Sequence, residues 1–90
     1  MTEAEILAAL RRFIQDNFLY MKPGFVLGDD DSLLKMGVVD SMGVMEVLGF
    51  LEERFNVTPD DTEITEANLG SLRAIGAFVR GKQSAPGFLA

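Results

Sequence analysis

Apolar residues recur at intervals of three and four positions in three stretches of the chain, and this spacing most constrains the fold. The stretches cover residues 3–18, 41–55 and 72–82. Each predicts an amphipathic helix, and a shorter helix is predicted near residues 65–69. No run of alternating β-branched residues indicates a sheet. We therefore expect an all-α protein: a small four-helix bundle with three longer helices, one short third helix, and a long loop between helices one and two.

Capping residues mark where these helices begin and end. Thr2 and Glu5 have the spacing of a capping box at the start of the first helix. Thr65 and Ser71 are expected to cap the third and fourth helices, and Asn56 follows the end of the second. These signals place the helix boundaries independently of the apolar spacing.

At about 100° per residue, helix two divides into faces of different chemistry. Its core face is predicted to contain Val44, Val47, Leu48, Leu51 and Phe55. The opposite face carries the carboxylates Glu46, Glu52 and Glu53. Met42 and Met45 lie outside the core face, where exposed thioethers suit contact with a partner protein. Phe50 also lies outside it, and is either exposed for a partner or covered by neighbouring segments.

Residues 22–40 lack a sustained period and are predicted to form the long loop. Its apolar pairs, Leu33–Leu34 and Val38–Val39, are expected to hold it against the core. The acidic cluster Asp29–Asp31 is interpreted as a turn with a helix cap. A calcium-binding loop would need alternating oxygen ligands ending in a bidentate glutamate, and that pattern is absent, so no metal site is predicted.

A chain of 90 residues has room for one small core. We expect one domain over residues 1–83 and a flexible C-terminal tail over residues 84–90.

The absence of cysteine excludes disulfides and thiolate metal sites and suits a cytoplasmic protein. No apolar run is long enough to span a membrane. The N-terminus places acids before bases, the reverse of a signal peptide.

The net charge of −6 is concentrated in the middle of the chain. Residues 29–66 hold eleven acidic residues against only Lys35 and Arg54. A surface of this charge repels nucleic acid and attracts basic protein partners. The alternative is that it serves only as a solvated, solubilising face.

Ser41 is a hydroxyl between two apolar runs in a chain that has no histidine. A Ser-His-Asp site is therefore impossible, and no nucleophile-elbow motif supports a pair with Lys35. The phosphate-loop pattern GxxxxGK[ST] is also absent. We therefore do not expect Ser41 to be a catalytic nucleophile.

Two interpretations of this junction remain open. Asp40 or Ser41 serves only to cap helix two, although a capping box would need glutamate where the chain has Val44. Alternatively, Ser41 is an attachment point, because a phosphate ester at a helix N-terminus is favourably placed. Asp40 could then orient a metal ion, or the basic residues of an incoming enzyme, during phosphoryl transfer.

The stretch GVVDSMGVMEVLGFLEERFNV resembles the modification site and recognition helix of acyl carrier and peptidyl carrier proteins. The family pattern is Gly-x-x-Asp-Ser-[Leu/Met], followed by an amphipathic helix that ends in acidic residues and phenylalanine. The residues that carry it here are Gly37, Asp40, Ser41, Met42, Glu52, Glu53 and Phe55. The resemblance extends over about residues 3–82.

This resemblance implies a non-catalytic carrier with 4′-phosphopantetheine on Ser41, transferred from coenzyme A by a phosphopantetheinyl transferase, with Asp40 supporting the transfer. Acyl or aminoacyl groups would be attached to the phosphopantetheine arm as thioesters. Helix two would be the surface to which partner enzymes with basic surfaces bind. The implied docking residues are Met42, Met45, Glu46, Glu52 and Glu53. We also expect a monomer.

The residues that follow Ser41 indicate which subtype of carrier protein the chain resembles. Carriers of fatty-acid synthesis usually follow the serine with leucine and a carboxylate, whereas here Met42, Gly43 and Val44 follow. The stretch looks closer to stand-alone aminoacyl, D-alanyl, peptidyl or specialised acyl carriers that work with adenylating ligases. An unmodified acidic helical interaction module is the alternative function.

Overall fold

The computed structural model describes residues 1–85, and this part of the chain contains helices and no strand. The elements are α1 (Glu3–Phe18), α2 (Ser41–Phe55), the 3₁₀ helix η1 (Asp61–Glu63), α3 (Glu66–Leu69) and α4 (Leu72–Gln83). The predicted all-α bundle, with a short third helix and a long loop before α2, is confirmed. The structure adds η1, which the sequence did not predict. Most of the predicted tail, residues 86–90, lies outside the described residues.

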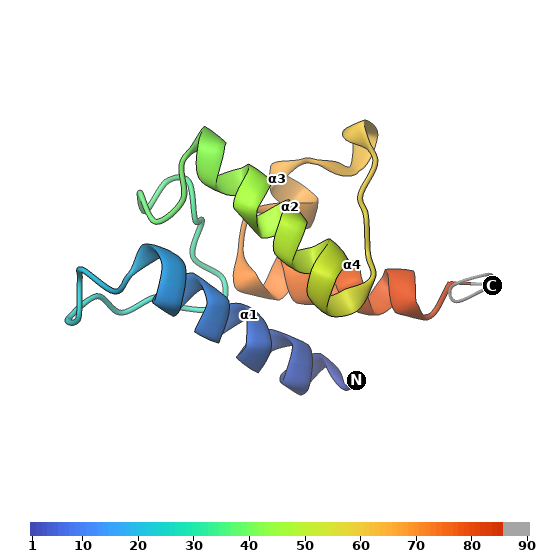
Figure 1. The fold of residues 1–90 in the computed structure, drawn as a ribbon, viewed down its shortest axis with the longest axis horizontal. Helices are drawn as coiled ribbons and strands as arrows, with labels where there is room; N and C mark the ends of the chain where they lie inside the picture. Colours follow the sequence, from blue (N-terminus) through green and yellow to red (C-terminus); the bar gives the residue numbers. More distant parts are fainter. Residues whose placement is uncertain (86–90) are drawn as a thin grey trace.

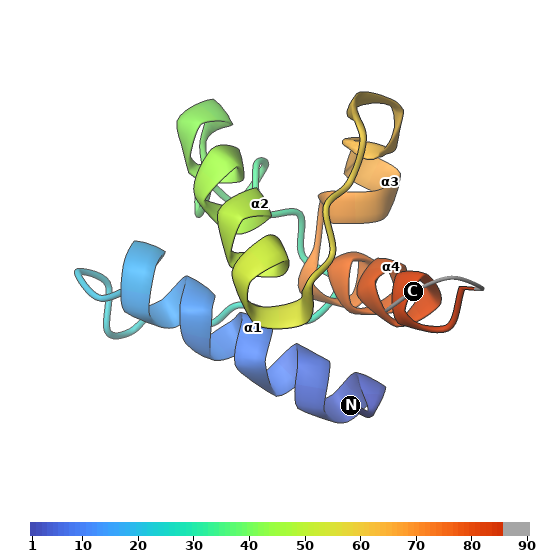
Figure 2. The same ribbon diagram turned by 45° about the vertical axis from the view of Figure 1, so that its right-hand side comes forward.

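α4 is the helix against which both α1 and α3 pack. α2 and α3 stand over the layer formed by α1 and α4 (Figures 1 and 2). The start of α2 lies at the same end of the molecule as the C-terminal end of α1 (Figure 1). The loop between α1 and α2 also lies at this end, so it determines how the first turn of α2 is presented.

The predicted caps are present. Thr2 and Glu5 form a reciprocal capping box at α1. The side chains of Thr65 and Ser71 accept hydrogen bonds from backbone N–H groups in the first turns of α3 and α4. Asn56 ends α2 with a left-handed backbone, at φ 57°. Each cap satisfies a backbone group that the helix end leaves unpaired.

The core face of α2 differs in part from the prediction. Its buried residues are Gly43, Val47, Leu51 and Phe55, which are spaced by four. Val44 packs against the core while partly exposed, and Leu48 is half-buried. Phe50 is covered rather than free, because its ring stacks on Phe13 of α1 with centroids 4.2 Å apart. Gly43 is buried because it lies against Phe18 of α1. The spacing of apolar residues could not predict this contact, because glycine has no apolar side chain.

The loop between α1 and α2 is pinned to the core by buried side chains and backbone hydrogen bonds. These side chains are Leu19, Leu27, Leu33, Val38 and Val39. The N–H of Leu33 donates to the carbonyl of Gly70, 2.8 Å away. The prediction was wrong for Leu34, which is 49% exposed. Both leucines line the cavity between α2 and α3, but only Leu33 is buried in the core.

The acidic cluster at the middle of this loop forms ion pairs with two helices. Asp29 pairs with Arg11 of α1 and with Arg73 of α4, and Asp30 pairs with Arg73. The hydrogen bond that Arg73 donates to the carboxylate of Asp30 is the main cause that raises the pKa of Arg73. Arg11 also donates to the carbonyl of Leu27 at 2.7 Å. This cluster therefore ties the loop to α1 and α4.

Candidate functional site

Ser41 is the first residue of α2, and its side chain is exposed. The cap is Asp40, whose Oδ1 accepts a hydrogen bond from the N–H of Gly43 at 2.7 Å. Of the two capping possibilities, the structure therefore selects Asp40. The serine hydroxyl is left free of that task.

A comparison of the four serines sets Ser41 apart. Ser32 donates to Glu66 at 2.6 Å, Ser71 caps α4, and Ser84 accepts from Arg80. Within residues 1–85, no hydrogen bond is found to the hydroxyl of Ser41, from Lys35 or from any other group. A free, exposed hydroxyl is the form that an external enzyme can modify without breaking internal contacts.

The electrostatic environment of this hydroxyl favours an anion. The first N–H groups of an α-helix have no intrahelical acceptor and carry a partial positive charge of about half an elementary unit. Ser41 lies at this end of a helix of 15 residues. A phosphate ester on the hydroxyl would gain from that field.

Two glycines hold this junction in shape. Gly37 has φ +70°, a left-handed conformation that favours glycine, and it reverses the chain before Val38 and Val39 enter the core. Gly43 lies against Phe18 of α1, and a Cβ there would lie 2.9 Å from the ring. Sequence reasoning missed Gly43 as a packing residue. The sequence does hold one indication of this role: Gly43 precedes Val47 by four residues, the same spacing that separates the buried residues of α2.

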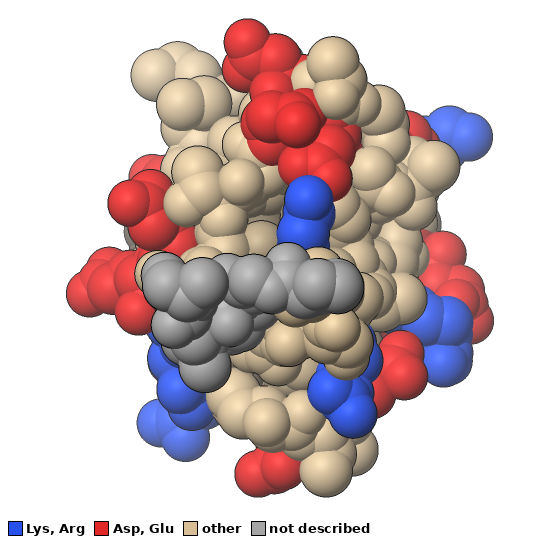
Figure 3. Space-filling model, turned by 90° about the vertical axis from the view of Figure 1, so that its right-hand side faces the viewer, with Lys and Arg blue, Asp and Glu red and all other residues tan. Residues whose placement is uncertain are grey.

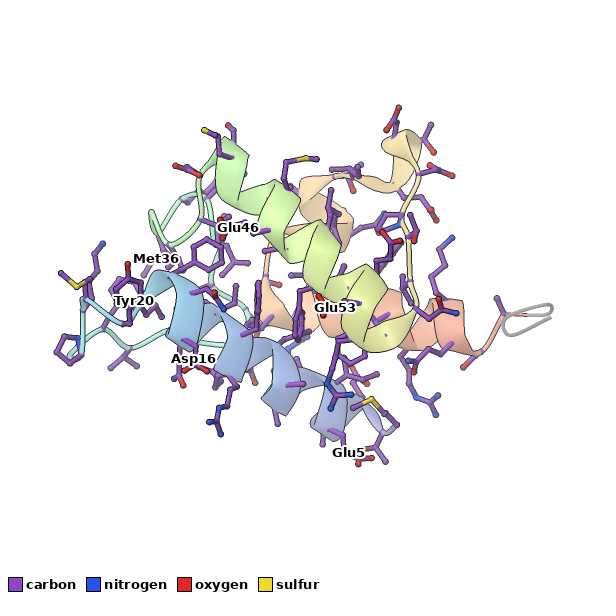
Figure 4. The ribbon with its side chains drawn as sticks, in the orientation of Figure 1. Glu5, Asp16, Tyr20, Met36, Glu46 and Glu53 are labelled. Atoms are coloured by element: carbon purple, nitrogen blue, oxygen red, sulfur yellow. The ribbon has the colours of Figure 1, made fainter. Side chains whose placement is uncertain are left out.

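Beyond Ser41, the exposed face of α2 carries thioethers and carboxylates. Met42 is 81% exposed and Met45 is 67% exposed, as predicted. Glu46 and Glu53 lie on α2, and Met36 lies on the loop at the same end as the first turn of α2 (Figure 4). Six further exposed apolar residues come from non-periodic loops, where spacing gives no signal: Tyr20, Met21, Val26, Leu34, Met36 and Ile64.

Four acidic residues form ion pairs within residues 1–85: Asp16, Asp29, Asp30 and Glu63, the last with Lys82 of α4. In Figure 3, one group of carboxylates lies at the top of the face and others lie along its left and right edges, with basic side chains among them. In contrast, the three carboxylates of α2 are exposed and have no ion pair within residues 1–85: Glu46, Glu52 and Glu53. The exposed face of α2 therefore carries negative charge that no ion pair within residues 1–85 neutralises.

Between α2 and α3 lies a cavity of about 130 Å³. Its lining is mostly apolar and includes Val44 and Val47 of α2, Leu69 of α3, and Ile64 before it. A cavity with such a lining accommodates a small apolar group.

Neither a metal site nor a membrane-spanning segment is found in the described part of the chain. No group of three or more carboxylates within residues 1–85 is arranged to hold a metal ion. None of the helices in that range has the length and hydropathy needed to cross a bilayer.

Comparison with known families decides what kind of domain this is. The family described as the phosphopantetheine attachment site matches residues 17–79, which is more than half of the chain. The chain belongs to this family. None of the curated proteins compared with it matches.

A phosphopantetheine attachment domain binds 4′-phosphopantetheine as its prosthetic group. The junction before α2 lies inside the matched residues, and its chemistry fits that group. It offers an exposed hydroxyl on Ser41 and the positive end of α2 for a phosphodiester. Asp40, which caps the helix, is the one carboxylate directly beside it in sequence.

Proposed function

We propose that this phosphopantetheine-binding domain is an acyl carrier protein whose arm is attached to Ser41. The observation that carries the proposal is the exposed, unbonded hydroxyl of Ser41 at the start of α2, within the residues that match the family. No other serine within residues 1–85 combines exposure, a free hydroxyl and a helix N-terminus.

When bound, the arm supplies a terminal thiol that holds acyl or aminoacyl groups as thioesters. The chain itself contributes position and charge. Asp40 holds the first turn of α2 in place and supports the transfer by the phosphopantetheinyl transferase, and the helix end stabilises the phosphodiester. In this account the chain is a carrier and not a catalyst.

Partner enzymes dock on the exposed face of α2. Met42 and Met45 give apolar contacts that can adapt to several partners. The carboxylates Glu46, Glu52 and Glu53 meet basic residues on those enzymes. The partners fall into two classes: the transferase, and the adenylating ligases or synthases that load and use the cargo.

The pathway is one of fatty-acid, polyketide, nonribosomal-peptide or related specialised biosynthesis. Met42 and Gly43 after the serine favour stand-alone carriers served by adenylating ligases. We further propose a monomeric, cytoplasmic protein that binds no nucleic acid, with its carrier domain over residues 1–83 and a flexible tail over residues 84–90.

Site mapping tests the proposed attachment. The full chain is incubated with coenzyme A and a promiscuous phosphopantetheinyl transferase, digested, and sequenced by tandem mass spectrometry. The phosphopantetheine mass is expected on the peptide that contains Ser41 and on none that contains Ser32, Ser71 or Ser84. Modification of one of those three in place of Ser41 would refute the assignment.

The alternative function, an unmodified acidic interaction module, predicts a different result. Such a module would bind its partner equally well as the wild-type chain and as Ser41→Ala, with no need for the arm. A carrier with Ser41→Ala should still bind its loading ligase through α2 but accept no cargo. Measuring binding and cargo loading side by side separates the two functions.

A further inference from the structure

Gly49 lies in the middle of α2 without a role in the fold. It is exposed, and a Cβ at this position would meet nothing within 4 Å. Its φ lies outside the positive range, so alanine would fit the backbone without strain. Glycine in a helix interior is disfavoured relative to alanine, because it loses more conformational entropy on folding. The fold alone would therefore be better served by alanine.

Three other glycines have a reason within the structure, whereas Gly24 of the first loop, like Gly49, has open surroundings. A Cβ on Gly43 would lie 2.9 Å from Phe18, and one on Gly76 would lie 3.1 Å from Leu7. Gly37 has a positive φ. Gly49 shares its open surroundings with one other helical glycine, Gly81 of α4. Gly81 is a matched control because it is also exposed.

The position of Gly49 on α2 gives it a distinct environment. Residues three and four apart are neighbours on a helix surface. Met45 and Glu46 therefore lie on one side of Gly49, and Glu52 and Glu53 lie on the other. All four are exposed, and the three carboxylates have no ion pair within residues 1–85. These four side chains surround Gly49, where the helix backbone has no side chain to cover it.

We infer that Gly49 is a specificity-determining contact at which a basic partner enzyme packs directly on the backbone of α2. The inference rests on the proposed function and names where the partner approaches most closely. Lys and Arg side chains of the partner form ion pairs with the three glutamates. A flat group of the partner packs on the α2 backbone at Gly49, between Glu46 and Glu52. A side chain at this position would hold the two surfaces apart.

The transferase is large enough to reach this patch. Gly49 is eight residues from Ser41, about 12 Å of helix rise. A standard interface covers about 800 Å² on each protein, equivalent to a disc of about 16 Å radius. An enzyme centred on Ser41 would therefore cover Gly49 along α2.

The test compares Gly49→Ala, Gly49→Leu and the control Gly81→Ala in the full chain. For each, the melting temperature is measured, along with kcat/KM for loading by a promiscuous phosphopantetheinyl transferase with coenzyme A. Gly49→Ala should raise the melting temperature by about 3–8 °C. Its loading should nevertheless fall several-fold, and that of Gly49→Leu tenfold or more. Gly81→Ala should load like the wild type.

The outcomes are distinguishable. Wild-type loading by both Gly49 variants would overturn the inference while leaving the carrier function intact. An equal loss in Gly81→Ala would also overturn it, because a glycine-to-alanine change in α4, away from the proposed contact, would then lower loading just as much. A wild-type chain that accepts no phosphopantetheine would overturn the proposed function and this inference with it.

Discussion

At the scale of single residues, Asp40 and Ser41 divide two tasks between them. Asp40 caps α2 through the N–H of Gly43, and Ser41 keeps its hydroxyl exposed. The sequence placed both residues at a helix start but could not choose the cap, since aspartate and serine are almost equally good caps. The choice depends on the backbone angle at which the loop enters the helix, which is a tertiary property.

Substitutions at Asp40 should separate capping from charge. Asp40→Ala should cost about 1 kcal/mol of stability, because the N–H of Gly43 loses its acceptor. Asp40→Asn should keep the melting temperature near the wild type, since asparagine caps equally well. If the charge supports transfer, Asp40→Asn should still load more slowly than the wild type. Thermal melts and transferase kinetics on both variants check this, and normal loading of Asp40→Asn would contradict a role for the charge.

At the scale of elements, helices were predictable and the faces they bury were only partly so. Helix ends depend on local signals such as Thr2, Thr65 and Ser71, so their caps could be identified from sequence. The burial of Phe50 against Phe13, and of Gly43 against Phe18, depends on how α1 approaches α2. The candidate site was predictable to the same degree: the position of Ser41 at the start of α2 could be predicted, but its freedom from capping could not.

The long loop offers a matched pair of adjacent leucines. Leu33 is 3% exposed and Leu34 is 49% exposed. Leu33→Ala should cost about 2–5 kcal/mol, because it leaves a cavity in the core where the loop is anchored. Leu34→Ala should change stability by less than about 0.5 kcal/mol. Chemical denaturation measures both values, and similar costs for the two variants would contradict the described loop.

The capping box of α1 makes a prediction about acid stability. The pKa of Glu5 is lowered from its usual 4.5, chiefly by the hydrogen bond that its carboxylate accepts from the backbone N–H of Thr2. Because the folded pKa is below the unfolded value, this contribution is fully present above pH 4.5 and is lost as pH falls through the folded pKa. Glu5→Gln, which can keep the box, should therefore lose less stability than the wild type between about pH 5 and pH 3. Identical acid profiles would count against the interaction.

At the scale of the whole molecule, charge is distributed unequally between internal pairs and free surface. The net charge is −6, and the acidic residues of α2 are left without ion pairs within residues 1–85. Glu52 and Glu53 lie near the C-terminal end of α2, where a negative charge opposes the helix dipole. The fold therefore tolerates an unfavourable arrangement that a basic partner would relieve.

Added salt should consequently stabilise the protein. Screening of like charges should raise the melting temperature between low ionic strength and about 0.5 M sodium chloride. The double variant Glu52→Gln/Glu53→Gln should melt higher than the wild type at low salt and respond less to added salt. A melting temperature that stays flat or falls with salt in the wild type would contradict this account of the surface.

The central claim is that one phosphopantetheine arm is attached, and that Ser41 holds it. Intact mass spectrometry tests this most directly, after wild-type and Ser41→Ala chains are incubated with coenzyme A and a promiscuous transferase. The wild type should gain the mass of one phosphopantetheine, and Ser41→Ala, folded to the same melting temperature, should gain none. A wild-type chain of unchanged mass, or a gain that survives in Ser41→Ala, would contradict the claim.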